Sequence, residues 1–332
     1  MDWLLAARMQ ANSLARPVNE AGPGGVADVV RRTGGLQAQT WRGAAYAVRA
    51  RSTATTLADV SVAQEDDRSV IRGWFMRGTL QLVPTEDAGA LLALLAPKLI
   101  SDTERRYGEL GLTESIRAQA ADVLEEHLLA HGPSSRAELA DVLVAADLIP
   151  EPKGQAVYAL IRHTGLLGRL CYGPGHDRSE TWVAVRAWLG RPLVLEGDLE
   201  ALAHRYLTAY GPASPQDFAT WSGLPVPIAR RGLQAAATTT FNISGTELLA
   251  VADLPGCEDL RLLGEFDPYL LGHKVRYQDL PAQIFPGGGM LRPAIVRSGR
   301  VVGSWRHADR STELFGTAVD LSAELADLAR FA

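Results

Sequence analysis

Two glutamines, Gln37 and Gln39, stand two residues apart in the stretch Gly34-Gly35-Leu36-Gln37-Ala38-Gln39-Thr40-Trp41. The glycine pair is expected to end a helix over 25–33, whose valines recur at helical spacing. On an extended segment two such side chains point the same way, so their amides could hold a water molecule or the edge of a nucleobase. An amide pair has donors and acceptors but no titratable group, so it cannot act as a strong general base. By itself the pattern is also typical of two solvated glutamines at a helix end.

The composition is that of an ordinary globular protein with several domains. The chain has 332 residues, of which 47% are hydrophobic and 21% charged, a length that predicts two or three domains. No apolar run approaches the roughly 18 residues needed to span a bilayer. The N-terminus has an acid and no basic region, so we expect no signal peptide and a cytoplasmic, nucleoid-associated protein.

Metal and redox chemistry are not expected. The two cysteines, Cys171 and Cys257, are far apart, which predicts neither a disulfide framework nor a metal site. The seven histidines and two cysteines show no ligand spacing typical of a metal centre, so we expect no metal and no cofactor.

Charge is distributed unevenly along the chain. The net charge of −5 argues against a nucleic-acid partner. However, residues 101–150 have ten acids and four arginines, a net of −6, and residues 261–310 have eight basic residues and four acids, a net of +4. Residues 1–80 have ten arginines and seven acids, a net of +3. This distribution fits a molecule with an acidic outer surface and a basic inner face.

Two segments repeat one order of elements: helix, turn, helix, longer helix, hairpin. The first follows the turn His131-Gly132-Pro133-Ser134-Ser135, and the second follows Tyr210-Gly211-Pro212-Ala213-Ser214. The last serine of each turn is a candidate N-cap. This order predicts winged-helix domains near 113–188 and 198–254. The N-terminal region, near 20–85, is expected to form a third.

The remaining segments complete the predicted fold. A helix over 87–95 is expected to lead into a charged connector, and strand-like stretches after residue 254 predict a β-rich unit, closed by a helix over 322–330. The predicted fold class is α+β: three tandem winged helices followed by a C-terminal β-barrel-like unit, in a C shape. The predicted domain boundaries are 1–112, 113–190, 191–256 and 257–332.

Basic side chains mark the expected third helices and the first wing, where winged helices contact phosphates. Many winged helices bind proteins instead, but these basic groups favour DNA. The candidates are Lys153, Arg162, His163, Arg169, His176, Arg178, Arg230 and Arg231.

Five motifs, taken together and in order, resemble those of the AlkZ/YcaQ-type winged-helix DNA glycosylases over nearly the whole chain. They are Arg8 with Leu14, Leu36-Gln37-Ala38-Gln39, Arg77-Gly78-Thr79-Leu80 with Leu82-Val83, Phe266-Asp267-Pro268-Tyr269-Leu270-Leu271-Gly272, and Gly299-Arg300-Val301-Val302-Gly303-Ser304-Trp305. The resemblance implies three winged helices and a β-barrel arranged as a C around DNA, with Gln37 and Gln39 catalytic. It also implies DNA contact by His273, Lys274 and Arg276, for which the alternative is an ion pair with Asp279 or Asp267. Two positions depart from the family pattern: Gln81 stands where relatives usually have His, and Val275 where they often have Asp.

The chemistry that suits an amide pair is the release of a base that already has a positive charge. A guanine alkylated at N7 is such a base, so its departure needs no general acid. Gln37 and Gln39 would then orient a water molecule and stabilise the developing sugar cation. No lysine is nearby to form a Schiff base, so we expect a monofunctional enzyme that acts as a monomer on duplex DNA with an alkylated guanine and leaves an abasic site. The lesion is a methyl adduct, a bulky adduct or an interstrand crosslink.

Two other classes of protein remain open. One is a non-enzymatic winged-helix regulator that binds DNA and has an inert glutamine pair; the other is a scaffold or small-molecule-binding protein with no affinity for duplex DNA. A bulky adduct does not fit a tight base-flipping pocket, so an enzyme would examine the lesion with a hairpin. The candidate hairpins are 173–179 and 286–290, and both are also typical of solvated loops.

Overall fold

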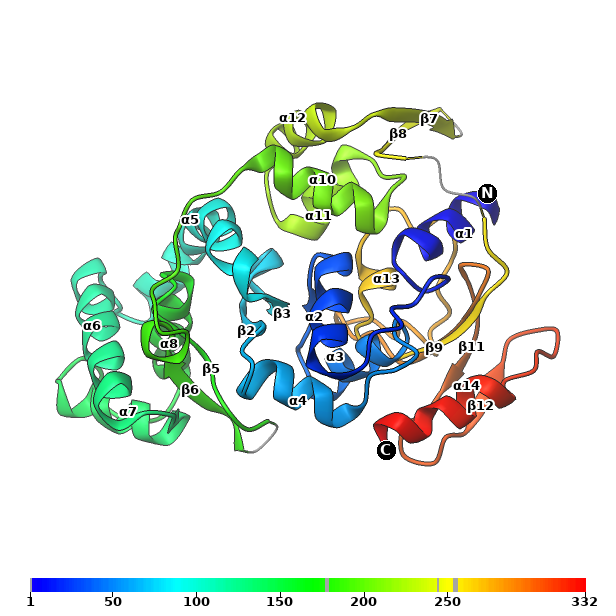
Figure 1. Ribbon diagram of the computed structural model, residues 1–332. Helices are drawn as coiled ribbons and strands as arrows, with labels where there is room; N and C mark the ends of the chain where they lie inside the picture. The colour runs from blue at the N-terminus through cyan, green and yellow to red at the C-terminus, as the bar shows by residue number, and fades with distance from the viewer. Residues whose placement is uncertain (1, 177–178, 244, 253–255) are drawn as a thin grey trace.

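The computed structural model describes residues 2–176, 179–243, 245–252 and 256–332. Three segments of the chain share one order of elements, which we call a helix–hairpin unit: helix, a short strand or an isolated bridge, helix, helix, two-stranded hairpin. Figure 1 shows the second unit at one end of the molecule, the C-terminal sheet at the other and the first unit between them. None of the described helices is long and apolar enough to cross a membrane.

The first unit covers residues 22–84 and follows a separate N-terminal helix, α1 (Asp2–Ala11). Gly34 ends its first helix in the left-handed conformation, with φ 66°, where glycine has no steric penalty. Thr40 accepts a hydrogen bond from the backbone of Gly43 and so begins the next helix. Its elements are α2 (Gly22–Thr33), β1 (Leu36–Gln37), α3 (Trp41–Arg49), α4 (Leu57–Glu65), β2 (Val70–Trp74) and β3 (Leu80–Pro84).

The second and third units confirm the predicted repeat of elements. Ser135 with Glu138 and Ser214 with Asp217 each form a capping box, so both serines are the N-caps that the sequence predicts. In the third unit an isolated bridge, Ala213 with Leu249, replaces the short strand. The second unit comprises α6 (Glu114–His131), β4 (Ser134–Ser135), α7 (Arg136–Ala145), α8 (Gln155–Leu166), β5 (Leu170–Tyr172) and β6 (Thr181–Ala184). The third comprises α10 (Leu199–Tyr210), α11 (Pro215–Ser222), α12 (Val226–Ala236), β7 (Thr239–Ile243) and β8 (Thr246–Ala250).

The first two units share one sheet. Its six strands are ordered β1-β3-β2-β5-β6-β4, and the two hairpins meet where Arg72 of β2 pairs with Tyr172 of β5. The short strand of each unit pairs with the second strand of its hairpin, as β1 does with β3 and β4 with β6. A displacement of the second unit would therefore be transmitted to the first through backbone pairing.

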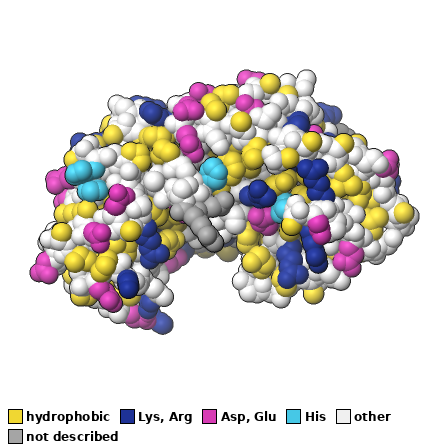
Figure 2. Space-filling view, turned by 90° about the horizontal axis from the view of Figure 1, so that it is seen from below, with side chains coloured by type: hydrophobic (Ala, Val, Ile, Leu, Met, Phe, Trp, Pro, Cys, Tyr) yellow, Lys and Arg dark blue, Asp and Glu magenta, His cyan; other side chains and the backbone are white. Residues whose placement is uncertain are grey.

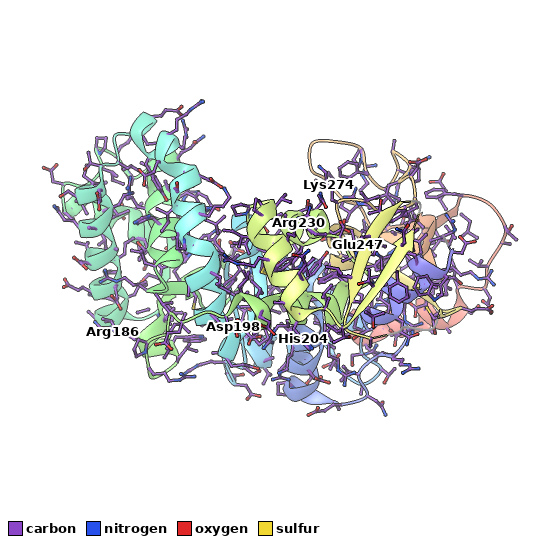
Figure 3. All side chains as sticks on the ribbon, turned by 90° about the horizontal axis from the view of Figure 1, so that it is seen from above. Arg186, Asp198, His204, Arg230, Glu247 and Lys274 are labelled. Atoms are coloured by element: carbon purple, nitrogen blue, oxygen red, sulfur yellow. The ribbon has the colours of Figure 1, made fainter. Side chains whose placement is uncertain are left out.

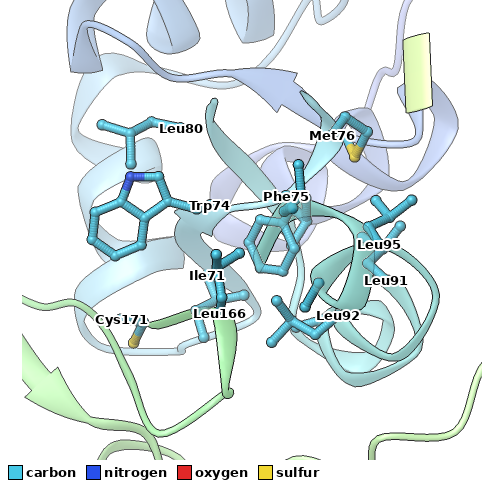
Figure 4. Close-up of a cluster of buried hydrophobic side chains, with 14 of the residues drawn as sticks. Ile71, Trp74, Phe75, Met76, Leu80, Leu91, Leu92, Leu95, Leu166 and Cys171 are labelled. Atoms are coloured by element: carbon cyan, nitrogen blue, oxygen red, sulfur yellow. The ribbon is translucent and has the colours of Figure 1, made fainter. Parts of the chain in front are cut away.

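The expected connector after residue 95 is wrong, because the helix continues. α5 runs from Thr85 to Glu109 with Pro97 inside it. Its charged stretch forms pairs one turn apart, Lys98 with Asp102 and Arg105 with Glu109, which stabilise an exposed helix face. The apolar residues of α5 pack beneath the β2–β3 hairpin: Figure 4 shows Leu91, Leu92 and Leu95 beside Phe75 and Met76.

The expected C-terminal barrel is also wrong. Four described strands form an open antiparallel sheet ordered β12-β11-β10-β9, so β9 and β12 stay unpaired with each other. Helices cover this sheet instead: Leu262, Ile295 and Trp305 share a core with Tyr46 of α3 and Phe331 near the C-terminus. The elements are β9 (Leu260–Leu263), α13 (Pro268–Leu271), β10 (Ala294–Arg297), β11 (Arg300–Trp305), β12 (Thr312–Leu314), α14 (Ser322–Asp327) and η3 (Leu328–Phe331), while α9 (Val185–Trp188) follows the second unit.

Candidate active site

Gln37 lies in the short strand β1, and Gln39 lies in the bend that follows it, just before α3 begins. Gln37 pairs with Gln81 of β3, and the backbone N–H of Ala38 donates to Leu80 O at 2.8 Å. Leu36 and Ala38 are buried, whereas Gln37 is half-buried and Gln39 exposed. That the two amides point to one face stays a prediction, because the strand ends at Gln37.

Arg77 holds the amide of Gln37 in one orientation. Its Nη2 donates to Gln37 Oε1 and its Nη1 to the carbonyl oxygen of Trp221, both at 2.9 Å. A guanidinium has donors only, so the oxygen of the Gln37 amide must face Arg77 and the nitrogen must face away. Arg77 adopts a left-handed backbone conformation, with φ 57° and ψ 11°, inside the turn η1 (Met76–Gly78). Such a conformation costs a residue other than glycine on the order of 1 kcal/mol.

A small cavity adjoins Gln37 where three parts of the chain meet. Its volume is about 10 Å³, close to the minimum for one water molecule. Tyr210 is buried against it, and among the described residues its hydroxyl has no hydrogen-bond partner. Gln81, at one of the positions that depart from the family pattern, is also buried there and donates to Thr79 Oγ1 at 2.8 Å. The lining residues are Gly35, Gln37, Arg77, Gln81, Tyr210, Trp221, Pro268 and Leu271.

A second arginine holds the backbone between the glutamines. Arg72 is buried in β2, and its Nε donates to Ala38 O at 3.1 Å. The other side of the guanidinium binds Glu180 at 2.7 Å and lies over the ring of Tyr172 at 4.5 Å. The carbonyl between the two glutamines is therefore anchored to the hairpin of the second unit.

A carboxylate supports the turn that follows Gln39. Thr40 Oγ1 donates to Glu265 at 2.8 Å, and the other oxygen of Glu265 lies 2.6 Å from His307 Nε2. Although burial opposes ionisation, the hydrogen bonds from His307 and Thr40 lower the pKa of Glu265 to about 2. Glu265 is therefore an anion at neutral pH, near the N-terminus of α3, where negative charge is stabilising.

The predicted hairpin 173–179 rests against the first unit over its described part. His176 stacks on Trp41 with ring centres 4.1 Å apart. Gln64 donates to Gly173 O, and the backbone N–H of Gly175 donates to Glu65, both at 3.2 Å. The predicted DNA contact Arg178 lies outside the described residues. The first part of this hairpin thus contributes an interface between units.

Two predicted DNA contacts are corrected by burial. His163 is buried in α8 beside the Tyr107 hydroxyl, and burial, assisted by the charge of Arg117, lowers its pKa to about 4. His273 is buried, lies 2.8 Å from Tyr210 O, and has its pKa lowered by burial and then by Arg8. Both are neutral interior histidines, so neither can reach a phosphate on the protein surface.

Three predicted arginines have partners within the protein. Arg169 binds Asp122 and Glu125 of α6. Arg162 donates to Thr103 Oγ1 at 3.3 Å and lies against Gly78, and Arg276 donates to Leu270 O at 2.8 Å. The ion pairs considered as alternatives for the 273–276 segment do not form with Asp267, whose carboxylate binds Arg51 instead.

Four predicted DNA contacts are exposed: Lys153, Arg230, Arg231 and Lys274. Figure 3 labels two of them, Arg230 and Lys274. Arg230 lies on α12, the helix after α11, and Lys274 follows α13; Trp221 of α11 and Leu271 of α13 line the cavity at Gln37. Figure 2 shows a notch between two lobes of the molecule, with Lys and Arg side chains on both lobes.

Sequence reasoning missed the roles of Arg72, Arg77 and Tyr210. Arg77 was noticed only as part of a family motif, and nothing in the spacing connects it with Gln37, 40 positions earlier. The one usable signal is its place in a tight turn before Gly78, where a charged residue is held between two strands.

Comparisons with known proteins agree with this geometry. A family model described as DNA glycosylase AlkZ-like matches residues 30–331. An interstrand DNA cross-link repair glycosylase of Streptomyces sahachiroi is 29% identical over 317 residues, which cover 85% of this chain and 82% of that protein. The solved structure of Streptomyces sahachiroi DNA glycosylase AlkZ superposes with a TM-score of 0.81 at 25% identity, covering 99% of this chain and 95% of that one.

The protein is therefore a DNA glycosylase, an enzyme that hydrolyses N-glycosyl bonds, and its partner is DNA. This result favours the enzyme over the non-enzymatic regulator. Because the family model covers most of the chain, the chain belongs to the AlkZ-like DNA glycosylase family.

Proposed function

We propose that this enzyme releases guanine alkylated at N7 from duplex DNA, including interstrand crosslinks, and leaves an abasic site. The observation that supports this substrate is the amide pair itself. Gln37 accepts a hydrogen bond from the guanidinium of Arg77, and Gln39, two residues further on, is exposed. Such a site has no acid to protonate a leaving base, so it suits a base that is already a cation. The crosslink named for the Streptomyces sahachiroi relative is a lesion of a kind that N7 alkylation can produce.

In the proposed reaction, the C1′–N9 bond breaks first and its electron pair neutralises the cationic base. The amide dipoles stabilise the sugar cation that develops at C1′. The oxygen of a water molecule held by the glutamine pair then forms a bond to C1′, and the proton lost by this water passes to solvent. Because Gln39 is exposed, this chemistry would take place at the protein surface rather than in a closed pocket.

We further propose that the three helix–hairpin units act as winged helices and that DNA occupies the notch of Figure 2. Lys153, Arg230, Arg231 and Lys274 would bind phosphates, since their side chains are exposed and form no ion pair with a described residue. Such contacts position the duplex without reading its sequence.

The direct experiment uses duplexes with a single N7-methylguanine or a single N7-linked interstrand crosslink, incubated with excess enzyme and then with alkali to break the strand at abasic sites. We expect strand breaks with wild-type protein and roughly 100-fold slower release with Gln37→Ala or Gln39→Ala. Gln119→Ala, an exposed glutamine of α6, is the matched control and should react at the wild-type rate. Wild-type rates in both active-site variants, or no release from either lesion, would refute the proposal.

A further inference from the structure

The contact between Arg77 and Gln37 separates the roles of the two glutamines. Gln37 Oε1 is occupied by the Arg77 guanidinium, which leaves the Nε2 hydrogens as the groups that Gln37 presents to a ligand. Gln39 is exposed and has no hydrogen bond to a described side chain, so its oxygen stays available as an acceptor. The two amides are thus chemically different although their residue types are identical.

We propose that Arg77 is a positioning residue that makes Gln37 the donor to the attacking water and leaves Gln39 as the acceptor. This inference rests on the proposed function and deepens it. The water accepts a hydrogen bond from Gln37 Nε2 with one lone pair and donates one of its hydrogens to Gln39 Oε1. Its second lone pair then attacks C1′. The charge of Arg77 withdraws electrons from the Gln37 carbonyl, which strengthens the N–H donor.

The residues around Arg77 hold its side chain in a position to bind the Gln37 amide. Its second donor binds Trp221 O, and Gly223, which ends α11 with φ 86°, packs against the Arg77 backbone. On the other side Gly78 leaves room for the Arg162 guanidinium, which a side chain at position 78 would meet. Burial lowers the pKa of Arg77, so the protein retains a desolvated cation where a neutral residue would be easier to bury. Trp221 and Gly223 of the third unit and Arg162 of the second unit thus surround the turn Arg77-Gly78, which holds the guanidinium against the amide of Gln37.

Replacing each glutamine by the isosteric glutamate tests which of the two amides is the donor to water and which is the acceptor. Gln37→Glu keeps an oxygen for Arg77 but removes the N–H donor, so we expect a loss of about 100-fold in the single-turnover release of N7-methylguanine. Gln39→Glu keeps the acceptor, so its rate should stay within about tenfold of wild type and fall below the pKa of the new carboxyl. An active Gln37→Glu with an inactive Gln39→Glu would reverse the assignment and overturn the proposal. If Gln37→Ala and Gln39→Ala were both fully active, the proposed function itself would fail.

Arg77 is tested with variants that keep the fold. Arg77→Gly removes the guanidinium where the left-handed backbone favours glycine, and should slow release by as much as about 100-fold with unchanged DNA affinity. Arg77→Lys should recover part of the rate, because an ammonium can donate to Gln37. In the Gln37→Ala background, Arg77→Gly should add little, since its effect passes through Gln37. Full additivity in this double-mutant cycle, with thermal unfolding unchanged, would contradict a positioning role.

Discussion

The first and second helix–hairpin units have the same elements in the same order but different chemistry. In both, the short strand pairs with the second hairpin strand, and a hydroxyl residue caps the following helix. In the second unit that cap, Ser135, is itself part of the short strand. In the first unit Ala38 and Gln39 stand between the strand and the cap Thr40. These two additional residues lead into the bend before α3, and Gln39 is exposed there.

The arginines of the two units also have different partners. Arg169 in the second unit binds two carboxylates of α6, an arrangement that stabilises its own unit. In the first unit Arg72 and Arg77 donate to the carbonyl of Ala38 and to the amide of Gln37. The arginine of one unit therefore binds carboxylates, whereas those of the other bind the carbonyl and the amide of the glutamine segment. The difference depends on what each guanidinium contacts, not on the order of elements.

The largest expected effect is on the rate of lesion release, which should depend on the glutamines at the short strand of the first unit and not on the short strand of the second unit. The double variant Gln37→Ala/Gln39→Ala should slow lesion release by about 1,000-fold, less than the product of the single losses if both amides hold one water. Ser134→Ala in β4 should leave the rate within about twofold of wild type, because the hydrogen bonds of the Ser134 hydroxyl to described residues are with His127 and the Gly132 carbonyl, away from the glutamines. Single-turnover assays with N7-methylguanine measure both. Comparable losses of rate in the two variants would show that the glutamine pair of the first unit has no particular role in lesion release.

The arginines should differ in stability as well. Arg72→Met leaves the Ala38 carbonyl and Glu180 without their buried partner, so we expect a loss of about 2–3 kcal/mol in the free energy of unfolding. Arg169 is partly exposed, and Arg169→Met should cost about 1 kcal/mol or less. Urea denaturation of the two variants measures the difference. Equal losses in the free energy of unfolding would show that the two arginines contribute alike to stability.

The helix caps sharpen the comparison further. Thr40→Ala and Ser135→Ala should each lower the free energy of unfolding by about 1 kcal/mol, the usual effect of losing an N-cap. Only Thr40→Ala should also slow lesion release, because Thr40 links the turn after Gln39 to Glu265. If the rate of Thr40→Ala equals that of Ser135→Ala at matched stability, the turn does not depend on its cap.

DNA affinity should distinguish exposed from paired arginines. Arg230→Ala should lower the slope of log affinity against log salt by about one unit, as expected for one lost phosphate contact. Arg169→Ala should leave that slope unchanged, since Arg169 already binds Asp122 and Glu125. Binding titrations at several salt concentrations decide between them, and an unchanged slope in Arg230→Ala would place α12 away from DNA.

The smallest expected effect at neutral pH is that of pH itself on the rate of release and on stability. Since amides do not titrate, the rate of release should be nearly flat from about pH 6 to 8. Stability should behave differently in the second unit: the pKa of His163 is about 4 in the folded protein and near 6.5 in the unfolded chain. The unfolded chain therefore binds the proton first, and stability falls as the pH decreases from about 6.5 to 4, by at most about 1.4 kcal/mol per pH unit. Urea midpoints of wild type and His163→Gln test this, and equal slopes would assign the acid sensitivity to other groups.

Local patterns accounted for most of the helices and both serine caps, because capping boxes and apolar periodicity act over a few residues. The sequence could not show that α5 continues through its charged stretch, since pairs such as Lys98 with Asp102 look the same in a connector. It also could not exclude the barrel, because strand closure depends on which edges meet in space. Basic residues such as His163 and His273 were assigned to the surface by type, whereas burial depends on packing from distant elements.

The sequence by itself determined the spacing of Gln37 and Gln39 and the family to which the chain belongs. Only the tertiary structure decided that Arg77 faces Gln37, that Arg72 holds Ala38 and that Trp221 binds the same guanidinium. The physical reason is the separation along the chain over which each pattern acts. Backbone periodicity repeats every two to four residues, whereas a hydrogen bond between side chains of different elements depends on how whole elements pack.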